Sequence, residues 1–273
     1  MNNNLVQSEL YRVWKNKRIL FITLFFLFIS IIDIYFVWYN SYLGPVAGGT
    51  NFKYELVPHP AFAAFLSGAS EGHIGQMLII WLLPIYLMFM MGDSYINERK
   101  YGYSSFRQSR IERNCMLKID LIISFLFSFV MILLILLLNF ILAVIIFHGG
   151  KNFNDLQTYV GTKYIGKVDS FQLMHPYNAY FVYTLMFSII TGLFSMICRA
   201  ITWLVPNYAF VYPLSFFVWM IFIISPFNLG SLVQPFTGEF DLGKSLISGM
   251  LLLVVTITFV VSGYIKRARY DEI

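Results

Sequence analysis

The segment that decides the architecture covers residues 93–118 and reads DSYINERKYGYSSFRQSRIERNCMLK. It is a long polar stretch between two long apolar runs, and it carries a dense positive charge. The whole chain of 273 residues is 58% hydrophobic and 12% charged, whereas an ordinary soluble domain has about 25% charged residues. The composition therefore predicts an integral membrane protein, with residues 93–118 as its cytosolic docking surface for a soluble partner. The net charge of +5 is not read as a sign of nucleic-acid binding.

Six segments are apolar enough to cross a bilayer core of about 30 Å, which requires about 20 helical residues. They cover residues 19–40, 76–92, 119–147, 177–197, 201–225 and 244–265. The link between the fourth and fifth lies around Arg199. Before the first span, apolar residues recur at helical spacing and predict a short amphipathic helix in the interface, with Trp14 at headgroup depth. The alternative is a frayed polar terminus. The prediction is one all-α transmembrane domain over residues 1–273.

The distribution of Lys and Arg orients these spans. If the N-terminus is cytosolic, fourteen of the 19 Lys and Arg residues, with every Arg among them, fall on the inside. The five on the outside are Lys53, Lys151, Lys163, Lys167 and Lys244. This asymmetry predicts six spans with both termini in the cytosol.

Two segments on the outside have unusual composition. Residues 61–66, AFAAFL, predict a short helix at the membrane surface. Residues 226–240 are too apolar for a solvated loop and too broken by Pro and Gly for a span, so they predict a re-entrant hairpin. Such a hairpin requires its backbone to be buried against protein.

Residues that could carry chemistry are few. The sequence has no GxSxG, HExxH or phosphate-binding glycine loop, so we expect no enzyme and no nucleotide hydrolysis by this chain. The four histidines lack ligand-like spacing, and we expect no metal site. Asp33 lies well inside the first span, where a carboxylate is costly, and this predicts a functional role for it, facing a substrate path or pairing helices. The alternative is an interfacial acid that reaches water. Pro84 and Pro213 interrupt their spans as possible hinges along a substrate path.

The central polar stretch resembles the loop between the second and third spans of the type-2 family of ABC exporter permeases. Glu98 and Gly102 match the acid and the glycine of that loop, and Arg110, Arg113 and Lys118 match its basic stretch. The Pro that usually precedes the basic stretch is missing here. The interfacial N-terminal helix, six spans, cytosolic termini and broken segment before the last span are also similar to that family.

The resemblance implies a coupling helix that sits in a groove of an ATP-binding subunit. The residues expected to contact that partner are Glu98, Arg99, Tyr101, Gly102, Phe106, Arg107, Arg110 and Arg113. It also implies the membrane-spanning subunit of a bacterial exporter in the cytoplasmic membrane, paired with a second permease copy or a similar permease. Separate ATPase subunits would hold ATP and Mg²⁺, and the cargo would be a peptide, an antimicrobial or a lipid-like compound. The alternative is a non-transporting immunity or sensor protein that binds an extracellular peptide through loops 41–75 and 148–176.

Overall fold

The computed structural model describes residues 3–43, 57–67, 74–103, 112–153, 167–225, 229–237 and 242–269. Within these ranges the regular structure is helical, and the β-type contact is an isolated bridge between Pro58 and Asn152. Five helical stretches are long and apolar enough to span a membrane. This confirms an all-α, multi-pass membrane protein. A further apolar helix, Tyr208–Ile224, has 17 residues.

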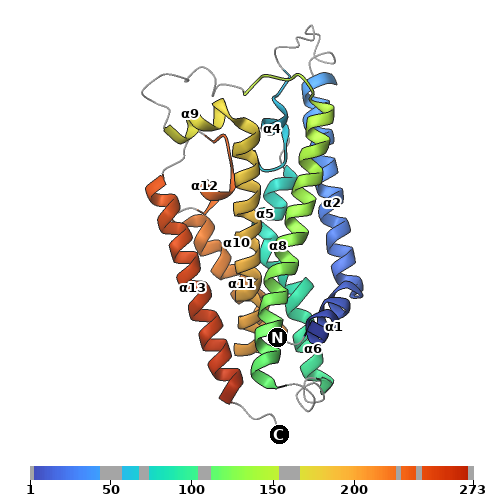
Figure 1. The fold of residues 1–273 in the computed structure, drawn as a ribbon, viewed down its shortest axis with the longest axis vertical. Helices are drawn as coiled ribbons and strands as arrows, with labels where there is room; N and C mark the ends of the chain where they lie inside the picture. Colours follow the sequence, from blue (N-terminus) through green and yellow to red (C-terminus); the bar gives the residue numbers. More distant parts are fainter. Residues whose placement is uncertain are drawn as a thin grey trace.

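The elements follow one another along the described residues as shown in Figure 1. In chain order they are α1 (Asn3–Trp14), α2 (Lys17–Trp38), the π-helical η1 (Tyr39–Leu43), α4 (Pro60–Ala63), α5 (Ile74–Leu87), the π-helical η3 (Met88–Gly92), α6 (Asp93–Lys100), α8 (Arg113–Ile146), α9 (Lys167–Met174), α10 (Pro176–Leu204), α11 (Tyr208–Ile224), α12 (Gly230–Val233) and α13 (Leu242–Arg269).

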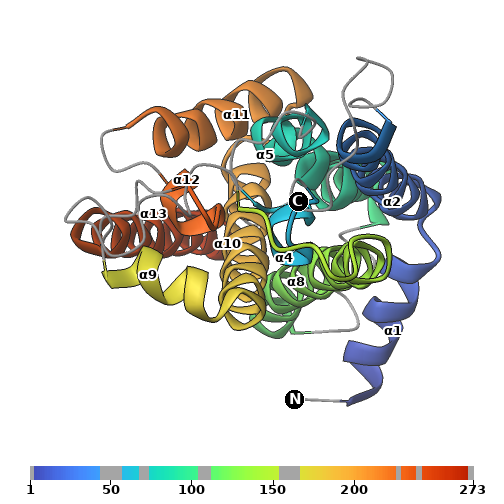
Figure 2. The same ribbon diagram turned by 90° about the horizontal axis from the view of Figure 1, so that it is seen from above.

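Helix α10 is the centre of the bundle and packs against both α8 and α13 (Figure 2). Gly192 lets α8 approach closely, because a Cβ at this position would lie 2.8 Å from the ring of Phe125. On the same interface Ser128 donates a hydrogen bond of 2.9 Å to Ser195, and both side chains are buried. Membrane helices associate through small residues and interhelical hydrogen bonds, because lipid provides no hydrophobic driving force between them.

The structure corrects the boundary between the predicted spans 177–197 and 201–225. Helix α10 passes through Arg199 without a break and ends at Leu204. The chain leaves the helix at Val205, which is extended and precedes Pro206. A residue before proline is disfavoured in the α conformation, so the helix ends there. Arg199 can stay inside the helix because its charge is paired within the bundle, as described below.

The segment 93–118 is more helical than a loop with one short helix. Helix α6 continues from α5 through η3, and α8 already begins at Arg113 rather than at residue 119. The third span is therefore extended at its N-terminal end, beyond the apolar residues on which the prediction rests. Residues 104–111 lie outside the described residues.

Residues 57–67 lie within the bundle near the end opposite to α6, as Figures 1 and 2 show. Only four of them form a helix, α4, and every residue of the segment except His59 is buried. The prediction of a helix at the membrane surface over 61–66 is therefore wrong. Because Phe62, Phe65 and Leu66 are large and apolar, the bundle interior is the place where protein can cover all of them at once.

Within this segment His59 is the N-cap of α4. Its Nδ1 accepts a hydrogen bond of 3.1 Å from the N–H of Ala61, and its ring stacks on Phe153 with centroids 4.7 Å apart. Burial lowers the pKa of His59 to about 4, because the charged imidazolium loses hydration. The ring is thus neutral at pH 7, which is the form in which Nδ1 can accept.

The segment before the last helix also packs into the protein. Leu229, Val233 and Phe236 are buried, and the N–H of Phe236 donates a hydrogen bond of 2.8 Å to Oε1 of Gln172. Among the described residues 229–237, positions 229, 233, 235 and 236 are buried and four others are partly buried, so the segment contacts the protein as a re-entrant hairpin would, and the hairpin stays a prediction.

Candidate functional site

Helix α6 ends at a glycine. The N–H of Tyr101 bonds to the carbonyl of Asn97, and the N–H of Gly102 bonds to the carbonyl of Arg99. Gly102 has φ +69°, and a Cβ there would meet nothing within 4 Å. A glycine in this conformation directly after a helix is a common helix stop, because other residues pay a steric penalty at positive φ. Gly102 therefore fixes the length of α6.

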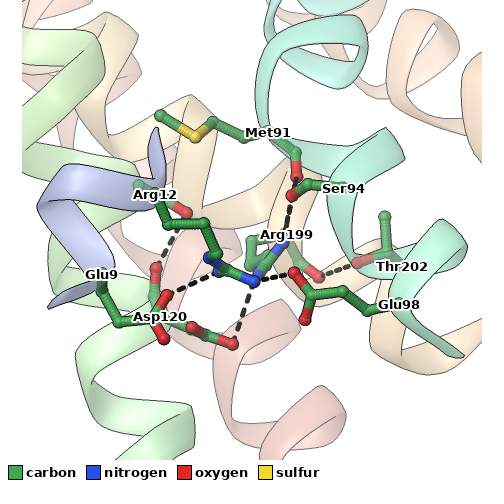
Figure 3. A network of polar contacts seen from close by, with 9 residues as sticks. Glu9, Arg12, Met91, Ser94, Glu98, Asp120, Arg199 and Thr202 are labelled. Carbon is green, nitrogen blue, oxygen red and sulfur yellow. Dashed lines mark hydrogen bonds and ion pairs between the residues drawn. The ribbon is translucent and has the colours of Figure 1, made fainter. Parts of the chain in front are cut away.

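The first tie of α6 runs to α1. Arg12 of α1 forms an ion pair with Glu98 of α6 and a second one, 2.6 Å long, with Glu9 one turn earlier on its own helix (Figure 3). The side chains of Glu9 and Glu98 are 10% and 12% exposed. Screening by solvent is reduced at such exposure, so these pairs contribute more than a surface pair would.

The second tie centres on a buried ion pair between α8 and α10, whose arginine also bonds to α6. Nη2 of Arg199 lies 2.9 Å from Oδ2 of Asp120, and the two side chains are 3% and 2% exposed. Nη1 of the same guanidinium donates to the carbonyl of Met91 at 3.0 Å and to Oγ of Ser94 at 3.3 Å. Figure 3 shows the Arg199 side chain pointing from α10 toward Met91 and Ser94. The guanidinium also lies 5.2 Å from the ring centre of Tyr95, within cation–π range.

Two further helices reach α6. The guanidinium of Arg267 on α13 lies 5.5 Å from the ring centre of Tyr95. The hydroxyl of Tyr208 on α11 donates to Oδ1 of Asn97 at 2.9 Å. Four positions of α6 thus contact four different helices: α10 and α13 through Ser94 and Tyr95, α11 through Asn97, and α1 through Glu98.

The π-helical η3 connects α6 to α5, and α5 contains a second irregularity at Pro84. Proline has no N–H, so the carbonyl of Ile80, four residues earlier, loses its helical donor. Nε1 of Trp219 on α11 donates to that carbonyl at 2.7 Å, and Trp219 is fully buried. Side chains of neighbouring helices thus bond to the α5–η3–α6 rod at both irregular places: Trp219 at the carbonyl of Ile80, and Arg199, together with Ser94 of α6, at the carbonyl of Met91.

The predicted partner-contact residues fall into three groups. Arg99, Tyr101 and Gly102 are exposed, and the Tyr101 side chain is 78% exposed. Glu98 faces α1, and Arg113 donates a hydrogen bond to the carbonyl of Arg267, so both are engaged within the bundle. The remaining three, Phe106, Arg107 and Arg110, lie outside the described residues.

The predicted substrate-path residues do not form one site among the described residues. Asp33 is buried on α2, with its Oδ1 3.6 Å from the position of a Cβ at Gly75 on α5. The alternative reading of Asp33 as an acid that reaches water is therefore wrong. Pro84 lies further along α5, where Trp219 reaches Ile80. Pro213 lies inside α11.

Sequence reasoning missed Asp120 and the roles of Arg199, Arg12 and Trp219. A signal for the ion pair was present: Asp120 stands at the start of the predicted third span and Arg199 at the end of the predicted fourth, at the same end of the bundle. Opposite charges at equal depth in two apolar helices favour pairing. Nothing in the sequence indicates that Trp219 serves the carbonyl freed by Pro84.

The chain was compared with known proteins. No model of a known protein family matches it, and no solved structure matches it. It is 31% identical over 271 residues to a protein of Bacillus subtilis (strain 168) described as uncharacterized protein YybM. The alignment covers 98% of this chain and 100% of the relative, so the similarity extends over the whole helical bundle. The chain belongs to the same protein family as YybM of Bacillus subtilis.

Proposed function

We propose that the chain is the membrane-spanning subunit of an ATP-driven exporter similar to the type-2 ABC permeases, in the cytoplasmic membrane of a bacterium. It pairs with a second copy or a similar permease. Separate ATPase subunits bind ATP and Mg²⁺ and perform the hydrolysis. The observation that carries this proposal is α6, a short helix between the second and third spans that four helices hold and whose C-terminal end is exposed.

A coupling element needs both properties. It must be joined firmly to the spans, so that a push on it moves them, and it must offer a surface to the soluble partner. The contacts of α6 with α1, α10, α11 and α13 support the first requirement. Arg99, Lys100 and Tyr101 are exposed at its C-terminal end and support the second. Charge mixed with aromatic surface favours orientation and specificity in a protein contact.

The proposal places α6 in the cytosol. Helix α1, α6 and the C-terminal end of α13 lie at one end of the bundle (Figure 1), where most of the Lys and Arg residues collect. Trp14 and Tyr11 of α1 are 78% and 61% exposed, while Glu9 is buried against the bundle. This division suits a helix lying in the membrane interface. Helix α11, about 25 Å long at 1.5 Å per residue, is the proposed sixth span.

The α5–η3–α6 rod transmits the motion in this proposal. A displacement of α6 by the ATPase is passed to α5 through η3 and bends the rod where its own hydrogen-bond ladder is interrupted, at Pro84. Trp219 passes the motion to α11. The cargo, a peptide, an antimicrobial or a lipid-like compound, moves along α2, α5 and α11, the helices that carry Asp33, Pro84 and Pro213.

Co-purification from the native host tests this function. The tagged protein is solubilised, and bound proteins are quantified by mass spectrometry for the wild type, for Arg99→Ala combined with Tyr101→Ala, and for Lys151→Ala. Lys151 is exposed near the end opposite to α6 and serves as the matched control. We expect an ATPase with the wild type and with the control, and about a tenfold lower recovery with the double variant, equivalent to about 1.4 kcal/mol.

Absence of any ATPase from the wild-type sample would sink the exporter proposal. Equal recovery with the double variant would place the contact elsewhere than on α6. Ligand binding by the outer loops in a protein that recovers no ATPase would favour the immunity or sensor function instead. Residues 44–56, 68–73 and 154–166 of those loops lie outside the described residues, and no described contact favours that function.

A further inference from the structure

The segment Val57–Ser67 occupies the interior of the bundle as a bound peptide would. It is a short stretch with one turn of helix, α4, which lies against α8 and α10. Ala61, Ala64 and Leu66 are fully buried. In Figure 2 α4 is seen inside the ring of long helices. The contacts that hold this segment show what chemistry the surrounding helices recognise.

Two amide side chains of the helices bind its main chain. Oδ1 of Asn139 on α8 accepts a hydrogen bond of 2.9 Å from the N–H of Phe65, and Nδ2 of Asn139 donates to the carbonyl of Ser30 at 3.0 Å. Nε2 of Gln76 on α5 donates to the carbonyl of Ser67 at 3.2 Å. Asn139 and Gln76 are 1% and 2% exposed. One donor and one acceptor are thus presented to a peptide backbone, whatever its side chains.

The other end of the segment is held by an isolated β-bridge. The N–H of His59 donates to the carbonyl of Asn152 at 2.8 Å, and the N–H of Asn152 donates to the carbonyl of Val57 at 3.1 Å. The backbones touch closely, because a Cβ at Gly150 would lie 2.1 Å from the carbonyl oxygen of Pro58. Main-chain pairing of this kind is how extended peptides are bound at exposed edges of protein backbone.

The side chains of the segment fill apolar positions. Phe62 lies edge-on to Phe153 and Phe236, with ring centroids 6.0 and 6.2 Å away. Phe65 is 1% exposed and Leu66 fully buried. Burying side chains of this size contributes about 1.5–3 kcal/mol each. An occupant that lacked them would leave cavities.

We propose that this place is the binding site for an apolar peptide cargo, and that Val57–Ser67 occupies it as a stand-in while no cargo is bound. The inference rests on the proposed function and narrows its cargo to peptides. The hydrocarbon part of a lipid chain has neither N–H nor carbonyl groups, so at this depth in the bundle it would leave the amides of Asn139 and Gln76 unpaired toward it. Each unpaired buried polar group costs about 1–3 kcal/mol.

The test uses the chain's own segment as the probe. A fluorescein-labelled peptide VPHPAFAAFLS, residues 57–67, is titrated against the full-length protein in nanodiscs and followed by fluorescence polarisation. The protein is the wild type or the triple variant Phe62→Ala, Phe65→Ala, Leu66→Ala, which weakens the hold of the built-in segment at unchanged length. The control peptide has Gly at these three positions.

We expect the triple variant to bind the probe at least about tenfold more tightly than the wild type does, and the control peptide to bind neither. Adding Asn139→Leu to the triple variant should weaken probe binding about tenfold. Failure of a folded triple variant to bind the probe, or binding that ignores both Asn139 and the probe's side chains, would overturn the proposal.

A second measurement keeps the proposal testable if the triple variant does not fold. Hydrogen exchange of the wild type should show the amides of residues 61–66 exchanging through local opening, at least about a hundredfold faster than buried amides of α8 and α10. If these amides exchange as slowly as those of α8 and α10, residues 61–66 are a permanent part of the core. That result would overturn the proposal that the segment is a displaceable stand-in for cargo. Neither experiment contains an ATPase. Refutation of the peptide site can therefore be distinguished from refutation of the exporter proposal, which depends on recovery of an ATPase.

Discussion

Replacing Arg199 by Met tests whether the Arg199–Asp120 ion pair beside α6 is as inaccessible to water as its geometry indicates. The variant leaves the Asp120 carboxylate, 2% exposed, without the guanidinium that lies 2.9 Å away. Breaking a buried pair from one side costs about 3–5 kcal/mol, because the remaining charge stays desolvated. The carbonyl of Met91 keeps a donor, since Oγ of Ser94 also donates to it at 2.8 Å. We therefore expect the apparent free energy of unfolding to fall by about 3–5 kcal/mol.

The double variant Arg199→Met, Asp120→Leu serves as the control. It removes both charges, and apolar replacement of a whole buried pair is often nearly neutral. The lost hydrogen bond from Arg199 to Met91 leaves a net cost of about 1 kcal/mol. The double variant should therefore be more stable than Arg199→Met, which is the opposite of additive behaviour.

Unfolding is followed by titration with SDS in mixed micelles, with hydrogen exchange of residues 93–100 as a local readout. We expect α6 to exchange faster in Arg199→Met, because Arg199 holds Met91 and Ser94 at its start. A single variant within about 1 kcal/mol of the wild type, together with an additive double variant, would refute the reasoning. It would mean that water reaches the pair.

Three further perturbations have defined outcomes. Trp219→Phe should cost about 1–3 kcal/mol by leaving the buried Ile80 carbonyl without a donor; in a Pro84→Ala background, where the helix supplies an N–H, SDS titration should show a smaller loss. Gly102→Ala should cost about 1–2 kcal/mol of α6 stability because its φ is +69°. A Cβ there would contact nothing within 4 Å, so the cost comes from the backbone conformation alone. Hydrogen exchange at the end of α6 measures it, and unchanged exchange would contradict the helix stop. His59 titrates near 6.5 when unfolded and at about 4 in the fold, so the unfolded state binds more protons between these values and stability should decrease as the pH is lowered from about 6.5 toward about 4. Thermal unfolding at several pH values checks this, and His59→Asn, which can still cap α4, should remove the dependence.

The α5–η3–α6 rod has two irregular points, at Pro84 and at η3, and both receive hydrogen bonds from side chains of neighbouring helices. A regular helix would carry force through its own hydrogen bonds. Here the carbonyl of Ile80 depends on Trp219 of α11, and the carbonyl of Met91 accepts from Arg199 of α10 as well as from Ser94 of α6, so contacts with α10 and α11 contribute to how α5 and α6 are joined. This dependence makes α6 a sensitive point at which to move the bundle.

The sequence by itself determined the class of the protein and the approximate places of its apolar helices. The thickness of a bilayer imposes a length on every span, so a run of about 20 apolar residues is informative without any knowledge of its neighbours. Local backbone rules act in the same way. Gly102 after a polar helix and Pro206 after a long apolar one are such local signals, but the predicted span 201–225 ran across Pro206, and the structure showed that α10 ends just before it.

Only the tertiary structure decided which charges are paired and which apolar segment lies inside. A lone Arg between two apolar runs reads as a loop, because an unpaired charge in a helix that crosses lipid is costly. Arg199 continues the helix because Asp120, 79 positions earlier, lies against it. Likewise residues 61–66 read as a surface helix, and they are buried where Asn139 accepts from the N–H of Phe65 and Gln76 donates to the carbonyl of the following Ser67. Pairings between residues far apart in the chain depend on how the helices pack, and periodicity and composition carry no record of that.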